Sequence, residues 1–142
     1  MGCSDGGCGF GVSLEGGTEN AISGNDVIRA QKVAIRVDAF SGAAKGTLIR
    51  GNVVRDAGVH GIAVDFEHVG PVTGTLVVAN FALRAGDDGI HVESPSTTVT
   101  RNIAVRNTDL GIDAVPGVTD GGGNRAVANG NPLECVNIGC QP

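Results

Sequence analysis

Short apolar runs recur along this chain, and each has the same order: a small residue, a β-branched residue, a variable residue and an apolar residue. The runs are 11–14, 34–37, 61–64, 89–92 and 111–114. Other short β-branched runs, such as 47–49, 75–78 and 103–105, end at Gly, Asn, Asp or Pro, as short strands do. No segment shows the 3.6-residue apolar stripe of a helix. The pattern therefore predicts an all-β chain in which the second and fourth residues of each run point inward.

Five asparagines keep step with these runs. They are Asn25, Asn52, Asn80, Asn102 and Asn124, with separations of 27, 28, 22 and 22 residues. Each of the first four precedes the small residue of the next run by nine positions, so two markers in fixed phase define an internal repeat. One coil of this length cannot bury its apolar side alone, so we expect coils to stack with parallel strand pairing. The asparagines should then form a buried ladder that satisfies turn backbone, and Asn107, off this column, should tolerate replacement better than Asn80.

The composition fits a thin, repetitive fold. The chain has 142 residues, 24 of them Gly, with four Phe and no Trp or Tyr, so Val, Ile, Leu and Ala must fill the core. The net charge of −5 and the scattered basic residues disfavour nucleic acid as a partner. No apolar run is long enough to predict a membrane span.

The cysteines form two short-range pairs, Cys3 with Cys8 and Cys135 with Cys140. Two local disulfides are the simplest interpretation, and they indicate an oxidising compartment and hence a secreted or cell-surface protein. The alternative, a structural zinc site, needs the two pairs to converge, whereas a linear stack places them at opposite ends.

Two segments resemble a known repeat family: the Gly-Asn to Gly-Ile stretch at 51–62 and the Gly-Asp-Asp-Gly-Ile-His-Val stretch at 86–92. Both are similar to the parallel β-helix repeats of the superfamily that contains pectate lyases and polygalacturonases. The tail at 120–140 looks like the closing segment of bacterial secreted members. The resemblance covers roughly residues 9–140 and implies a right-handed parallel β-helix of about five coils with three short parallel sheets. It says little about activity, because this fold carries many functions.

We expect residues 1–142 to form a single β-helix domain. We expect the chain to enter partway through a coil, because residues before Gly11 match only the end of a repeat and the sequence shows no N-terminal cap of the kind usual in family members. We therefore expect a C-terminal fragment of a longer secreted protein. An open first coil would present unpaired strand edges and favour self-association or contact with neighbouring β-helix coils.

The most distinctive chemical pattern is a column of carboxylates. The position after each run holds Glu15, Asp38, Asp65 and Glu93, and then Val115. We expect the four acids to point outward at about 4.8 Å spacing, where like charges repel unless a cation or a basic neighbour relieves them. The adjacent outward column consists of Ser13, Arg36, Ala63, His91 and Asp113. Arg36 and His91 are its basic members and can relieve the repulsion.

This column suggests a site whose catalytic candidates are Asp38, Asp65, Glu93, His91 and Arg36. Oxygen ligands favour a hard cation, so Asp38, Asp65 and Glu93 are candidate Ca²⁺ ligands. The acids are equally candidates for acid–base chemistry, because neighbouring coils place carboxylates at separations used by glycosidases. The plain alternative is a solvated polar face whose charges are screened by water and salt.

Two insertions flank the middle of the acid column. The intervals from Asp38 and from Asp65 to the next asparagine exceed the other two by about five residues, and the second insertion contains Glu67 and His68. In the pectate-lyase-like relatives, loops on this side shape the substrate groove. The candidate substrate-binding residues are Glu67, His68, Asp88 and Asp113.

Asp87-Asp88-Gly89 resembles the paired aspartates of polygalacturonases, but the Asn-Thr-Asp, Gly-His-Gly and Arg-Ile-Lys motifs of those enzymes are absent. A turn role for the aspartates is therefore favoured. We expect an extracellular module that is architectural or binds polysaccharide. The alternative is a polysaccharide-active enzyme, whether lyase, glycoside hydrolase or epimerase.

Overall fold

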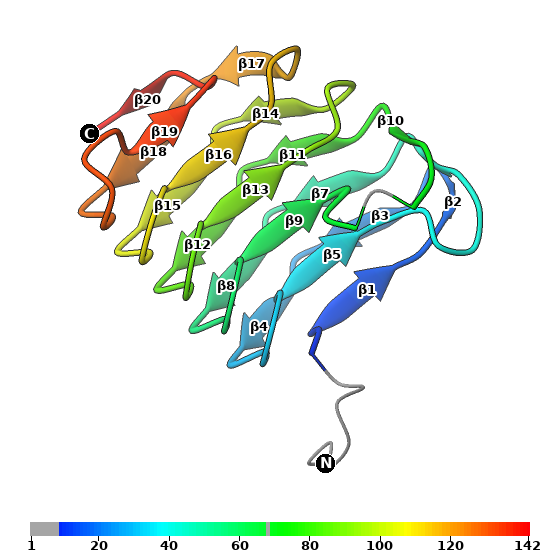
Figure 1. Cartoon of the computed structure of the whole chain (residues 1–142), viewed down its shortest axis with the longest axis horizontal. Coiled ribbons are helices and arrows are strands. Elements are labelled where there is room, and N and C mark those ends of the chain that lie inside the picture. Colours follow the sequence, from blue (N-terminus) through cyan, green and yellow to red (C-terminus); the bar gives the residue numbers. More distant parts are fainter. Residues whose placement is uncertain (1–8, 68) are drawn as a thin grey trace.

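Residues 9–67 and 69–142 are described by the computed structural model of the chain, which is drawn in Figure 1. Its regular elements are short strands that pair only in parallel, each with the equivalent strand of the next coil. The strands stack into a β-helix of about five coils, as the repeat predicted. No helix long and apolar enough to cross a membrane is found in the described part of the chain.

Sheet 1 has six strands and faces the viewer in Figure 1. Its strands, in spatial order, are β1 (Val12–Leu14), β5 (Ile35–Val37), β9 (Ile62–Val64), β13 (Ile90–Val92), β16 (Ile112–Ala114) and β19 (Cys135–Val136). The first five of these strands coincide with the runs recognised in the sequence, because each run supplies two inward apolar residues around one outward residue.

Two further sheets complete each coil. Sheet 2 contains β3 (Ala21–Ser23), β7 (Leu48–Arg50), β11 (Leu76–Val78), β14 (Thr98–Thr100) and β17 (Thr119–Gly122). Sheet 3 contains β4 (Asp26–Ile28), β8 (Val53–Arg55), β12 (Phe81–Leu83), β15 (Ile103–Val105), β18 (Asn124–Val127) and β20 (Cys140–Gln141).

A fourth, small sheet was not expected. It consists of β2 (Gly17–Thr18), β6 (Ala44–Lys45) and β10 (Val72–Thr73), between sheets 1 and 2 in the first three coils. The prediction of three sheets is therefore incomplete. Strands β6 and β10 follow the two insertions, whose returning ends pair with each other in the same parallel register as the rest of the coil.

Equivalent apolar residues stack in the core. Ile35, Ile62, Ile90 and Ile112 are in register across sheet 1, and all are fully buried. A core of this kind needs no large aromatic, because each coil adds the same β-branched side chain to the same column.

The predicted asparagine ladder is confirmed. Asn52 donates from its backbone N–H and from Nδ2 to Oδ1 of Asn80, at 3.0 and 2.9 Å. Asn80 does the same to Asn102, and Asn25 and Asn102 do so to Asn52 and Asn124. Four of these amides also donate to the backbone carbonyl of the middle residue of a sheet 2 strand in the preceding coil, so the ladder satisfies backbone groups that water does not reach.

The turn before each ladder asparagine requires a left-handed residue. The residues at this position have φ between 54° and 70°, and three of the five are glycine: Gly24, Gly51, Ala79, Arg101 and Gly123. Glycine adopts this conformation without steric cost, which explains the recurrent Gly-Asn pair.

The structure contains a second ladder that the sequence pattern did not indicate. Asn107 is buried, accepts the backbone N–H of Ala85 at 2.9 Å, and donates to Asn129 Oδ1 at 2.8 Å. Asn107 lies off the main column, as predicted, but its burial and hydrogen bonds match those of the main column and give no structural reason for it to tolerate replacement better than Asn80.

One predicted disulfide is confirmed. Cys135 and Cys140 are bonded, with Cα atoms 6.1 Å apart, and they join β19 to β20 at the last coil. The predicted Cys3–Cys8 pair lies outside the described residues.

Candidate functional site on the outer face of sheet 1

The outward residues of sheet 1 form the column predicted from the sequence. Ser13, Arg36, Ala63, His91 and Asp113 are directly opposite one another on β1, β5, β9, β13 and β16. Two basic groups, Arg36 and His91, therefore lie two coils apart on one face, with the small Ala63 between them.

Arg36 is the centre of the first cluster on this face. Its guanidinium contacts Glu15 at 2.9 Å, Asp38 at 3.3 Å and Glu67 at 3.3 Å, and it donates to Ser13 Oγ. Only 4% of Arg36 is exposed, so its charge is compensated by these carboxylates rather than by water.

Two aromatic rings cover the same guanidinium. Its Cζ lies 3.9 Å from the ring centre of Phe10 and 5.1 Å from that of Phe40. Such contacts are favourable cation–π interactions, and they leave Phe40 with 46% of its surface exposed.

The expected solvent exposure of Asp38 is wrong, because its side chain is completely buried. One carboxylate oxygen accepts the backbone N–H of Glu67 at 3.0 Å, and the other faces Arg36. Burial raises the pKa of Asp38, although the Glu67 N–H and the Arg36 charge act in the opposite direction. The inserted loop after β9 supplies this N–H, so the carboxylate turns towards the loop instead of joining an exposed column.

The other acids of the predicted column also separate. Glu15 pairs with Arg36, and Glu93 pairs with His91. Asp65 has a left-handed backbone, with φ of 62°. Two groups of three close metal-binding side chains occur in the described part of the chain, and neither contains the expected trio of Asp38, Asp65 and Glu93.

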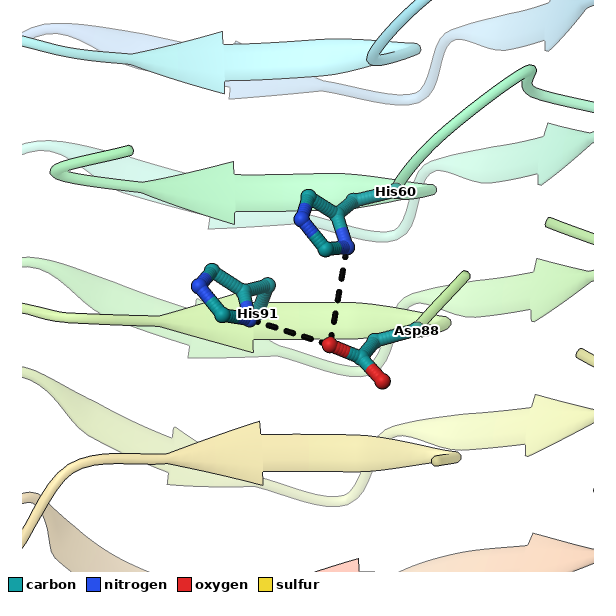
Figure 2. A group of neighbouring side chains, drawn as sticks. All are labelled: His60, Asp88 and His91. Carbon is teal, nitrogen blue, oxygen red and sulfur yellow. Dashed lines mark hydrogen bonds and ion pairs between the residues drawn. The ribbon is translucent and has the colours of Figure 1, made fainter. Parts of the chain in front are cut away.

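The second cluster surrounds two histidines (Figure 2). His60 and Asp88 occupy equivalent turns before β9 and β13, and His91 is the outward residue of β13. Asp88 Oδ2 lies 3.0 Å from His91 Nδ1 and 3.6 Å from His60 Nδ1. The two imidazoles stack with ring centres 4.3 Å apart.

Three carboxylates surround His91. Asp88 binds Nδ1, Glu93 Oε1 lies 2.7 Å from Nε2, and Asp113 Oδ2 lies 3.4 Å from Nδ1. Burial works against charging this imidazole, but the hydrogen bonds to Asp88 and Glu93 prevail and raise the pKa of His91 to about 9. For His60, burial and the neighbouring charge of His91 lower the pKa to about 4. At neutral pH the pair therefore carries one positive charge, on His91.

Phe66 closes the second cluster from the inserted loop. Its ring packs edge-on against His60, with centroids 5.3 Å apart, and against His91 at 6.3 Å. Three of the four phenylalanines, Phe10, Phe40 and Phe66, thus contact a cationic or imidazole group on this face.

The structure brings most of the predicted site residues to one of the two clusters. Glu67 joins Arg36, whereas Asp88 and Asp113 join His91. Asp88 Oδ1 also accepts the backbone N–H of Leu110, in the equivalent turn of the next coil, at 3.0 Å. His68 lies outside the described residues.

Sequence reasoning missed His60 and the aromatic rings. The signal for His60 was nonetheless present, because it occupies the same position relative to Gly61 as Asp88 does to Gly89. Comparing that turn position between coils would have placed the two side chains next to each other.

A surface hollow of about 360 Å³ lies elsewhere, over sheet 2. It is lined by aliphatic side chains of β7 and β11 and by Arg50 and Arg101. None of the residues of the two clusters lines this hollow, so it does not change the assignment of the site.

Comparisons with protein-family models, with curated proteins and with solved structures found no match. The resemblance to the pectate-lyase-like superfamily therefore stays a prediction.

Proposed function

We propose that this protein is an extracellular polysaccharide-binding module that holds a glycan against the outer face of sheet 1. The observation that carries the proposal is the gathering of Phe10, Phe40 and Phe66 on a face that also presents charged side chains. Ligand sites commonly combine aromatic surface with a few placed polar groups. In a chain with four phenylalanines, such concentration on one face needs a reason beyond core packing.

The charge of the face favours an uncharged glycan. Carboxylates outnumber cations around Arg36 and His91, so a polyuronate would meet net repulsion. Sugar hydroxyls, in contrast, can donate to the partly exposed acids on this face. These are Glu15, Glu67, Glu93 and Asp113.

The disulfide between Cys135 and Cys140 supports a secreted or cell-surface location, because such bonds persist in oxidising compartments.

The test is a binding assay with neutral glucans, xylans and mannans, and with polyuronates for comparison, in buffer that contains EDTA. We expect binding to at least one neutral polymer, weakened about tenfold by Phe40→Ala, since buried aromatic contacts dominate interfaces of this kind. Ile28→Ala is the matched control, because Ile28 is 50% exposed on sheet 3. Equal binding by the Phe40 and Ile28 variants, or retention of polyuronates alone, would contradict the proposal.

The alternative, a polysaccharide-active enzyme, has one supporting observation. His91 lies within 2.7–3.4 Å of oxygens from three carboxylates on the same face, which is the kind of grouping that acid–base chemistry on a sugar requires. A screen of the same polymers for new reducing ends or unsaturated products tests it, with Asp113→Asn as the variant expected to lose activity. Unchanged product formation by that variant would argue against this site.

A further inference from the structure

Three potential ligand atoms converge where β9 and β13 begin. One ligand atom each from His60, Asp88 and His91 lies within 4.8 Å of the other two (Figure 2). We propose that these three residues bind a divalent transition-metal ion such as Zn²⁺, through His60 Nδ1, Asp88 Oδ2 and His91 Nδ1.

The spacing of these atoms suits such an ion. Asp88 Oδ2 is 3.0 Å from His91 Nδ1 and 3.6 Å from His60 Nδ1. Ligand atoms about 2.0–2.1 Å from a tetrahedral zinc ion are about 3.3 Å from each other, and the two observed distances lie on either side of this value.

An independent observation points to a missing partner at the same place. His60 is only 3% exposed, and its Nδ1 has no hydrogen-bond partner in the structure. The distance of 3.6 Å to Asp88 is too long for a hydrogen bond. A buried imidazole nitrogen without a partner is costly, and a bound cation would satisfy it.

Neighbouring groups orient the three proposed ligand side chains through hydrogen bonds and packing, as is usual around bound metal ions. Nε2 of His91 donates to Glu93 Oε1 at 2.7 Å, which fixes the ring, and an ion bound at Nδ1 would displace the proton that Nδ1 shares with Asp88. The backbone N–H of Leu110 donates to Oδ1 of Asp88 at 3.0 Å, so Oδ2 is the carboxylate oxygen that faces the proposed ion. Phe66 packs against both imidazoles from the inserted loop.

Binding has a geometric consequence for the histidines. The two rings are nearly parallel, at 9°, whereas a bound ion lies close to the plane of each imidazole that coordinates it. At least one ring must therefore turn out of the stack when the ion binds. Three protein ligands leave a coordination position for water or for a hydroxyl of a bound molecule.

The ligand types favour a transition metal over Ca²⁺, because imidazole nitrogen suits Zn²⁺, Ni²⁺, Cu²⁺ and Fe²⁺, whereas Ca²⁺ prefers oxygen. A second group, Asp87, Asp88 and Asp109, contains only carboxylates, and Asp109 already accepts from Asn131 at 2.8 Å. It provides a useful control, because it shares Asp88 with the proposed site.

The experiment is a ZnCl₂ titration of the full chain by isothermal calorimetry, after removal of metal with EDTA and without reductant so that the disulfide stays closed. We expect one Zn²⁺ per chain in wild type, no binding in His60→Gln and His91→Gln, and unchanged binding in Asp109→Asn. Glu93→Gln should weaken binding about 10- to 100-fold. The imidazole NMR signals of His60 and His91 should both shift on saturation.

Lack of binding by wild type, or full binding by folded His91→Gln, would overturn the proposal. Loss of binding in Asp109→Asn with retention in His91→Gln would assign the ion to the carboxylate group instead. Circular dichroism checks the fold of each variant, and if His60→Gln does not fold, His91→Gln alone decides. Because glycan binding is measured in EDTA, failure of the metal site and failure of the proposed function give separate results.

Discussion

The imidazole rings of His60 and His91 stack 4.3 Å apart, yet they hold their protons with very different strength. The difference arises from their neighbours. His91 has two carboxylates in hydrogen-bond contact, whereas Nδ1 of the more deeply buried His60 has none.

This pair predicts a stability maximum near pH 6.5–7. The folded pKa of His91, about 9, lies above the usual 6.5, so its contribution is complete below pH 6.5 and is lost as the pH rises through 9. The folded pKa of His60, about 4, lies below 6.5, so its contribution is lost as the pH falls from 6.5 towards 4. Each contribution is at most about 3 kcal/mol.

Urea unfolding of the metal-free protein at pH 5, 6.5 and 9 measures both effects. His91→Gln should remove most of the alkaline loss, and His60→Gln most of the acidic loss. The groups facing His91 are the carboxylates of Asp88, Glu93 and Asp113. A stability that is the same at pH 6.5 and pH 9 in wild type would refute the assignment to His91.

Replacing Asn80 by alanine should lower the free energy of unfolding by about 1–3 kcal/mol, because the backbone N–H of Asn52 and the carbonyl of Ile49 lose their buried partner. Asn107→Ala should cost a similar amount through the N–H of Ala85. Asn131→Ala is the control, since its bond to Asp109 is exposed. Equal melting temperatures for all three variants would contradict the ladder's role.

Arg36→Met should destabilise the fold by about 3–5 kcal/mol, because it leaves the carboxylate of Asp38 buried without its cation. Adding Asp38→Asn should recover part of this loss, and the double-mutant cycle gives the coupling between the two side chains. Arg84→Met, which breaks an exposed pair with Asp56, should change stability little. Full additivity of the Arg36 and Asp38 effects would show that the two groups do not interact.

Non-reducing peptide mapping should recover Cys135 and Cys140 in one disulfide-linked peptide, and it also tests the predicted Cys3–Cys8 bond. Opening the Cys135–Cys140 loop should cost about 2 kcal/mol, because the loop is short and its closure entropy is small. Thermal melting of the double variant Cys135→Ser, Cys140→Ser, compared with wild type, measures this loss of stability. A mixed link between the two ends of the chain would be incompatible with the stacked coils.

The backbone of this fold could be predicted from the sequence because it is set by repetition. The runs around Ile35, Ile62, Ile90 and Ile112 fix the strands of sheet 1, and the ladder asparagines fix where each coil turns. Every such signal appears several times, so register follows from periodicity alone.

The site was harder to predict because it depends on features that do not repeat. Asp38 occupies the expected backbone position, but the inserted loop donates an N–H to its carboxylate, which is buried instead of exposed. Phe40 and Phe66 come from the same two insertions, whose paths no neighbouring coil specifies. The partners of Arg36 could be guessed only as the nearest opposite charges in the adjacent column.

The two asparagine ladders restrict which insertions and deletions the fold can accept. Asn80, Asn102 and Asn124 are each 22 residues apart, and so are Asn107 and Asn129. Removal of a whole coil would bring equivalent amides together again, whereas loss of one or two residues within a coil would misalign a buried ladder. Sequence length can therefore vary in whole coils, or freely in the loops that carry Phe40 and Phe66, and the binding face can diversify without disturbing the scaffold.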